Sequence, residues 1–124
     1  MYYTYFSTGN VIIDGEHANI DCMIDMCQNK GAEWAATARI LIAALADHLD
    51  SEERICDEAG LNMTTAHREE HRMLKIRLAG IERQLDDDKL LKDVFLGTLR
   101  DILFYHISHF DRELNPHRPS GEPI

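Results

Sequence analysis

Hydrophobic residues recur at intervals of three and four along four stretches of the chain. On an α-helix this spacing places the side chains on one face, and short turn-forming segments separate the stretches. The four stretches are residues 14–28, 33–58, 64–85 and 89–114. The pattern predicts an all-α fold, an up-down-up-down antiparallel four-helix bundle with an N-terminal arm.

The residues at the ends of these stretches set the expected boundaries. Asp14 is the predicted N-cap of the first helix, and Gly60 the glycine that stops the second. One aspartate of Asp86–Asp88 is expected to cap the fourth helix, which Asn115-Pro116 would end. We therefore expect a single domain over 1–124, with an arm over 1–13 and a mobile tail over 115–124.

Each apolar face also carries residues that can bind a metal. His48 and Glu52 are four positions apart, so they lie one helical turn apart on the same face. The remaining ones are His17, His67, His71 and His106. Burying five imidazoles and a carboxylate in one layer is costly unless they are paired or bind metal. The pattern therefore predicts a metal site between the helices rather than a hydrogen-bonded polar core.

The ligand set points to more than one ion. A metalloprotease helix needs a glutamate directly after the first histidine of its HxxxH motif, but Arg68 follows His67. A single tetrahedral zinc ion would leave ligands unused. Two metals bridged by carboxylate fit better, although the Glu-x-x-His motif of common di-iron bundles is absent. Neutral histidine ligands favour reversible O₂ chemistry over O–O cleavage, and manganese or zinc occupancy stays open.

Four motifs, taken together, resemble a known family. They are Ile13-Asp14-Gly15-Glu16-His17, His48-Leu49-Asp50-Ser51-Glu52-Glu53, His67-Arg68-Glu69-Glu70-His71, and His106-Ile107 with Asp111. In this order and spacing they look like a hemerythrin domain, specifically the bacterial hemerythrins, over nearly the whole chain. Departures from the family are Tyr5/Phe6 and Phe104/Tyr105 at positions that often carry tryptophan, and Cys56 at a position that often carries methionine.

The resemblance implies a site with two iron ions per chain and seven protein ligands. His67, His71 and His106 would hold one iron, and His17 and His48 the other. Glu52 and Asp111 would bridge the two irons together with an oxo or hydroxo group. The iron with two histidines would keep an open position for O₂, beneath an apolar pocket of Leu103, Ile102 and Ile107.

Asp111 does not follow from helical geometry. It lies five residues after His106, about 140° away on a regular helix, whereas Glu113 or His109 would be the geometric choice. Asp111 is taken on the family's spacing, which requires a distortion of the last helix, for which we hypothesise a π-bulge. His109 is expected outside the ligand set, His117 on the surface, and Tyr105 on the side of the bundle.

The charge and the apolar content of the chain limit the kinds of partner and the location that we expect. Thirteen Lys and Arg against 22 Asp and Glu give a net charge of −9, which argues against nucleic acid and anionic membranes as partners. No apolar run approaches the roughly 20 residues that span a bilayer, and the N-terminus lacks a signal-peptide pattern, so a cytoplasmic location is expected. Cys22, Cys27 and Cys56 are expected to be reduced and mostly buried.

The sequence thus predicts a non-haem di-iron protein that binds O₂ reversibly, as a carrier, store or sensor. NO and peroxide are further candidate ligands. The alternatives are a di-iron enzyme on the same bundle, such as an oxidase, a peroxidase or an NO reductase, and an iron store or structural bundle. Nothing in the sequence resembles a substrate pocket or a buried general acid.

Overall fold

A computed structural model of the chain describes residues 8, 10–61, 63–87 and 90–114. These residues form four α-helices and one short 3₁₀-helix, with no strand among them. The helices are α1 (Val11–Gln28), α2 (Trp34–Ala59), α3 (Thr65–Asp86) and α4 (Lys92–His109), followed by η1 (Asp111–Leu114). The prediction of an all-α protein is confirmed.

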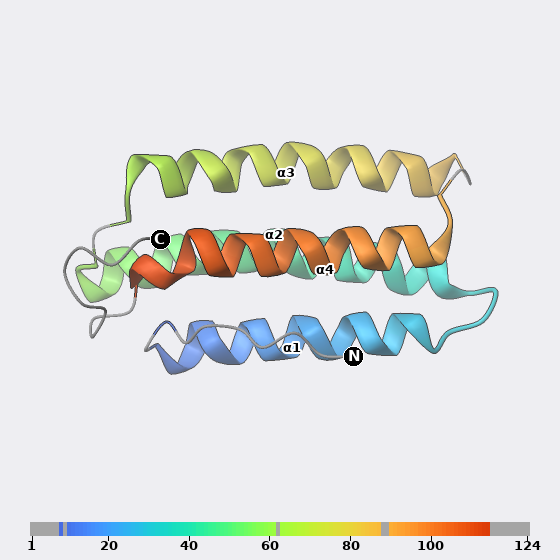
Figure 1. The fold of residues 1–124 in the computed structure, drawn as a ribbon, viewed down its shortest axis with the longest axis horizontal. Helices are drawn as coiled ribbons and strands as arrows, with labels where there is room; N and C mark the ends of the chain where they lie inside the picture. Colours follow the sequence, from blue (N-terminus) through green and yellow to red (C-terminus); the bar gives the residue numbers. More distant parts are fainter. Residues whose placement is uncertain (1–7, 9, 62, 88–89, 115–124) are drawn as a thin grey trace.

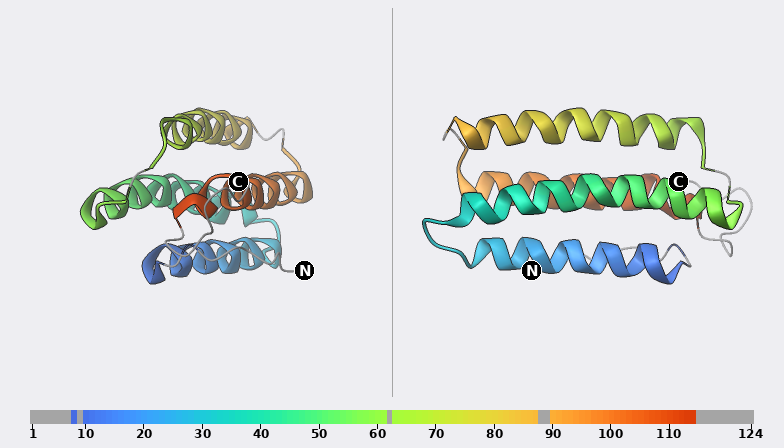
Figure 2. Two further views of the ribbon diagram at one scale, coloured as in Figure 1. Left: turned by 60° about the vertical axis from the view of Figure 1, so that its left-hand side comes forward. Right: turned by 180° about the vertical axis from the view of Figure 1, so that it is seen from behind.

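The four α-helices lie side by side, and each runs opposite to the one before it (Figure 1). α1 packs against α2 and α4, and α2 also packs against α3. The two further views show the same arrangement from the side and from behind (Figure 2). The up-down-up-down bundle is therefore confirmed. The first halves of α1 and α3 lie at the same end as the second halves of α2 and α4.

Two predicted helix ends are observed. Thr64 caps α3, because its hydroxyl accepts a hydrogen bond from the backbone N–H of His67 at 3.1 Å. Gly60 ends α2 with φ of 70°, a left-handed conformation that glycine adopts without steric cost. The backbone N–H of Leu61 then reaches back to the carbonyl of Cys56 at 2.9 Å.

Two other predicted helix starts are wrong. α1 begins three residues earlier than expected, because Asn10 rather than Asp14 caps it and accepts from the backbone N–H groups of Ile12 and Ile13. Asp14 instead accepts two hydrogen bonds of 2.9 Å from the backbone and hydroxyl of Thr8. The Asp14 side chain thus ties Thr8 to the first turn of α1.

The fourth helix starts later than predicted and has no aspartate cap. Its N-cap is Leu91, which offers no side-chain hydrogen bond, and Asp86 is the last residue of α3. The apolar spacing of the fourth stretch includes Leu91 and predicts that it is buried, but it is 72% exposed. Because a residue before the first helical turn does not follow the helical period, the spacing rule fails there.

The core is divided into two apolar clusters. The larger one fills the middle of the bundle with residues from all four helices, including Leu41, Phe95 and Leu99. The smaller one, here called the end plug, closes one end and consists of Ile13, Ile55, Cys56, Met63 and Leu114. Each end-plug residue lies within about one helical turn of a predicted ligand on its own segment. The predicted metal ligands therefore lie between two apolar layers.

Most of the predicted arm (residues 1–7 and 9) and the tail (115–124, including His117) lie outside the described residues. Residues 11–13 of the predicted arm belong to α1. Cys27 and Cys56 are buried, but Cys22 is exposed on α1, against expectation, and all three are free thiols. Among the described residues, no helix is long and apolar enough to cross a membrane.

Candidate metal centre

The structure brings the seven predicted ligands together in one buried cluster. Each is at most 3% exposed, and they come from α1, α2, α3, α4 and η1. The members of this cluster are His17, His48, Glu52, His67, His71, His106 and Asp111. The antiparallel arrangement produces this meeting, because it places the early part of α1 and α3 beside the late part of α2 and α4 (Figure 1).

Asp111 reaches the cluster because the last helix ends before it. The α-helical hydrogen bonds continue to Phe110, whose N–H donates to the carbonyl of His106 at 2.9 Å. Phe110 then leaves helical geometry, with φ of −120° and ψ of −53°, and η1 begins at Asp111. The distortion that we predicted is present, but it is a helix end and a 3₁₀ turn rather than a π-bulge. The α-helix therefore ends at His109 rather than at the predicted Leu114.

Glu52 turns its two carboxylate oxygens toward two different sets of histidines. Oε1 lies 3.0 Å from Nε2 of His67 and 3.0 Å from Nε2 of His71. Oε2 lies 3.3 Å from Nε2 of His48 and 3.8 Å from Nε2 of His17. One oxygen therefore faces the histidines of α3, while the other faces those of α1 and α2.

Asp111 divides its oxygens in the same way. Oδ1 lies 2.9 Å from Nε2 of His67 and 2.9 Å from Nε2 of His106, and Oδ2 lies 2.9 Å from Nε2 of His17. The cluster therefore has two halves that share both carboxylates. The three-histidine half contains His67, His71 and His106, and the two-histidine half contains His17 and His48.

Four polar atoms that face one another in the two-histidine half have no hydrogen-bond partner among the described residues. These atoms are Nε2 of His17, Nε2 of His48, Oε2 of Glu52 and Oδ2 of Asp111. The 2.9 Å contact between His17 and Asp111 is close, but the two groups are not aligned as donor and acceptor. Buried polar groups are rarely left unsatisfied, so four that converge on one point fit a cation bound there.

In the three-histidine half, two ring nitrogens face each other. Nε2 of His71 lies 3.2 Å from Nε2 of His106, and both rings pack against His67 at centroid distances of 4.7 Å and 5.1 Å. Imidazole nitrogens in this position suit a divalent transition metal. The donor atoms in both halves therefore fit metal ions, as expected for the two-metal centre that the sequence implied.

Without metal, the cluster binds protons tightly. Burial alone would lower the pKa of His17 and His67, but contacts with Asp111 and Glu52 raise both to about 9. Burial likewise would lower the pKa of His106, but the negative charge of Asp111, more than any other contact, raises it to about 10. Burial would raise the pKa of both carboxyls, yet the histidines hold that of Glu52 well below its usual range and that of Asp111 at about 2. Metal ions must therefore displace protons from the histidines.

Two carboxylates outside the cluster contact ligand histidines, and we had assigned neither a role. Glu16 Oε1 lies 2.7 Å from Nδ1 of His48, and Glu53 Oε2 lies 2.9 Å from Nδ1 of His71. Each adjoins a cluster residue in sequence, since Glu16 precedes His17 and Glu53 follows Glu52. That adjacency was the available signal, but only the packing of neighbouring helices shows which histidine each contacts.

The other residues singled out from the sequence lie around the cluster or away from it. Leu103, Ile102 and Ile107 are buried in the larger apolar cluster. His109 is exposed, and its Nδ1 lies 3.0 Å from the carbonyl of Tyr105, which is itself 51% exposed on the side of the bundle. Both lie outside the cluster, as expected.

Three relatives have the same name and nearly the same degree of similarity. The chain is 28% identical, over 110 residues, to a protein named bacteriohemerythrin from Pseudomonas paraeruginosa. It is equally similar to bacteriohemerythrins from two strains of Pseudomonas aeruginosa, and each match covers 85% of this chain and 72% of the relative.

The resemblance to bacterial hemerythrins is confirmed. No family model matches the chain, and no solved structure matches it significantly. With the buried histidine and carboxylate cluster, the similarity indicates a hemerythrin-like metal-binding protein.

Proposed function

We propose that this hemerythrin-like chain binds O₂ reversibly at two iron ions held by the seven-residue cluster. The observation that carries the proposal is the division of Glu52 and Asp111, each of which turns one oxygen to each half of the cluster. Two carboxylates shared in this way suit a pair of ions better than a single ion. The name of the relatives supports iron as the metal.

The unequal halves support ligand binding at one ion. The two-histidine half offers fewer protein donors than the three-histidine half, so it leaves more of a metal's coordination sphere for an external ligand. Two irons held by the cluster would together supply the two electrons that O₂ takes up, one from each ion. NO and peroxide are further candidate ligands for the same position.

The protein's own contribution is to keep water and acids away from the site. The end plug closes one side of the cluster, and the larger apolar cluster closes the other. Leu103 is 1% exposed and lies three residues before His106. Ile102, which precedes Leu103, and Ile107, which follows His106, are also buried. We assign these three residues to the apolar wall of the O₂ pocket. Such a wall would favour release of O₂ over irreversible oxidation, because protons cannot easily reach the bound ligand.

A reversibility experiment tests this proposal. The protein is loaded with Fe(II) without oxygen, exposed to O₂, and flushed with argon over several cycles while the visible spectrum is followed. A visible band that appears with O₂ and disappears after flushing, in a protein with two irons per chain, is the expected result. A one-way conversion to the ferric form with turnover of added reductant would instead favour the enzyme alternative.

The ligand assignment has its own test. His67→Ala should lose most of the iron, because Nε2 of His67 contacts both shared carboxylates. The matched control is His109→Ala, since His109 is exposed and lies outside the cluster. Two irons per chain retained by His67→Ala would refute the assignment.

A further inference from the structure

Two histidines of the cluster each contact a carboxylate through Nδ1, the ring nitrogen that faces away from the cluster, and the two carboxylates are similarly exposed. Glu16 contacts Nδ1 of His48 at 2.7 Å, and Glu53 contacts Nδ1 of His71 at 2.9 Å. The Glu16 side chain is 30% exposed and that of Glu53 is 28% exposed, so water screens both charges to a similar degree. A difference between the two must therefore come from their other partners.

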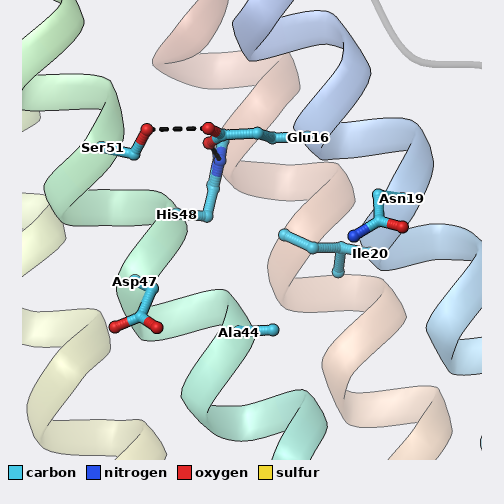
Figure 3. A pocket seen from close by; sticks show the side chains of 7 residues that line it. All are labelled: Glu16, Asn19, Ile20, Ala44, Asp47, His48 and Ser51. Atoms are coloured by element: carbon cyan, nitrogen blue, oxygen red, sulfur yellow. Dashed lines mark hydrogen bonds and ion pairs between the residues drawn. The ribbon is translucent and has the colours of Figure 1, made fainter.

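The second partner of Glu16 is neutral. The hydroxyl of Ser51 donates to Glu16 Oε2 at 2.7 Å, and no cation contacts Glu16 among the described residues. Figure 3 shows Glu16 of α1 reaching toward Ser51 and His48 of α2. These three residues help to line a pocket of about 270 Å³. The other residues that line this pocket (Asn19, Ile20, Ala44 and Asp47) include no cation. Arg54 donates from Nη2 to the Ser51 oxygen at 3.3 Å, so the nearest cation is separated from Glu16 by the Ser51 hydroxyl. The negative charge that Glu16 presents to His48 is therefore reduced less than a direct ion pair would reduce it.

The second partner of Glu53 is a cation. Arg68 donates from Nη1 to Glu53 Oε1 at 3.0 Å and from Nη2 to Asp57 Oδ1 at 2.9 Å. The two acceptors hold the planar guanidinium in one orientation, which a lysine could not match. Arg68 thus neutralises part of the charge that Glu53 presents to His71.

We propose that Arg68 is a positioning residue that makes the two halves of the cluster unequal donors. A carboxylate behind a ligand histidine orients the ring and raises its basicity, and a more basic ring stabilises the ferric over the ferrous ion. Arg68 weakens this effect for His71 in the three-histidine half by direct contact with Glu53, whereas the Ser51 hydroxyl weakens it less for His48. The half with fewer histidines thereby holds the stronger individual donor.

The inference rests on the metal-binding part of the proposed function, but not on O₂ binding. It assigns to Arg68, through Glu53, control of the ferric to ferrous ratio at a given potential. Arg72, one turn further along α3, provides a matched control because it is exposed and pairs with Glu69 outside the cluster. Both arginines are replaced by glutamine, which keeps a polar side chain and removes the charge.

The iron-loaded proteins are poised at one fixed potential with soluble mediators, and the ferric to ferrous ratio is measured by absorbance. Arg68→Gln should raise the ratio roughly two- to fivefold, the range of effects that a partly exposed charge exerts. Arg72→Gln should leave it unchanged. Adding Arg68→Gln to Glu53→Gln should have little further effect, because the route through Glu53 is then absent.

A measurement on the metal-free protein guards against a misfolded variant. The ¹⁵N resonance of His71 Nδ1 should shift in Arg68→Gln but not in Arg72→Gln, since only the first strengthens the carboxylate behind the ring. Equal ratios in the two variants, or an undiminished Arg68 effect without Glu53, would overturn the inference. Failure of the unaltered protein to bind iron would overturn the proposed function as well. The predicted shift without reversible O₂ binding would support the inference and refute the O₂ proposal.

Discussion

Asp111→Asn removes the negative charge of Asp111 and keeps a side chain of nearly the same size and shape. In the metal-free protein at about pH 6, His17, His67 and His106 carry protons because contacts with Asp111 and Glu52 raise their pKa values. These raised pKa values stabilise the native state below the unfolded pKa of 6.5. The stabilisation is lost as the pH rises through about 9 to 10.

The pKa shift of His17 gives the expected loss of unfolding free energy. Its pKa rises from 6.5 to about 9, and each pKa unit corresponds to about 1.4 kcal/mol. Because Glu52 shares in this effect, removing the Asp111 charge should cost roughly 2–3 kcal/mol of unfolding free energy at about pH 6. At about pH 10 His17 and His67 are mostly neutral in the native state and His106 is about half protonated, so the loss should be much smaller than at pH 6.

Urea unfolding followed by far-UV circular dichroism measures both values on the metal-free protein. Asp93→Asn is the control, because Asp93 is exposed in the first turn of α4 and lies outside the cluster. We expect a small and pH-independent effect for the control. Equal losses for Asp111→Asn at the two pH values, or a loss no larger than that of Asp93→Asn, would refute the electrostatic reasoning.

Two further predictions concern the metal and the backbone. Titration of the metal-free protein with Fe(II) should release protons, because the metal displaces them from the histidines whose pKa values are raised. The affinity for Fe(II) should therefore rise between about pH 6.5 and 9. Calorimetry in two buffers would detect the released protons, and a pH-independent affinity would contradict the prediction. Gly60→Ala should lower the unfolding free energy by about 1 kcal/mol, because alanine is strained at the positive φ of this position. The control Gly97→Ala lies within α4, where no atom is near an added Cβ, so it should be neutral or stabilising. Thermal unfolding measures both effects.

Much of the fold follows from the spacing of apolar residues. The 3.6-residue period that predicts four helices also selects most of their buried positions, including Ile24, Leu45 and Leu78. Helix ends were harder to predict, because Asn10 and Asp14 are both good capping residues. Only the structure shows that Asn10 caps α1, by accepting from the N–H groups of Ile12 and Ile13, while Asp14 contacts Thr8.

Five histidines and Glu52 could be assigned to the metal centre because they share the apolar faces of regular helices. Asp111 could not be found by periodicity, since its position depends on where α4 ends. Phe110 leaves helical geometry, and η1 then brings the carboxylate to 2.9 Å from three histidines. The family resemblance supplied a residue that helical geometry alone would have passed over.

The sequence by itself determined the four helices, their apolar faces and the residue types that a metal centre needs, because these depend on local periodicity and side-chain chemistry. Only the tertiary structure decided how the two carboxylates divide between the halves of the cluster. It alone also placed Ser51 beside Glu16 and Arg68 beside Glu53. Those contacts join neighbouring helices across the bundle, and a pattern along one chain segment carries no information about the rotation of its neighbours.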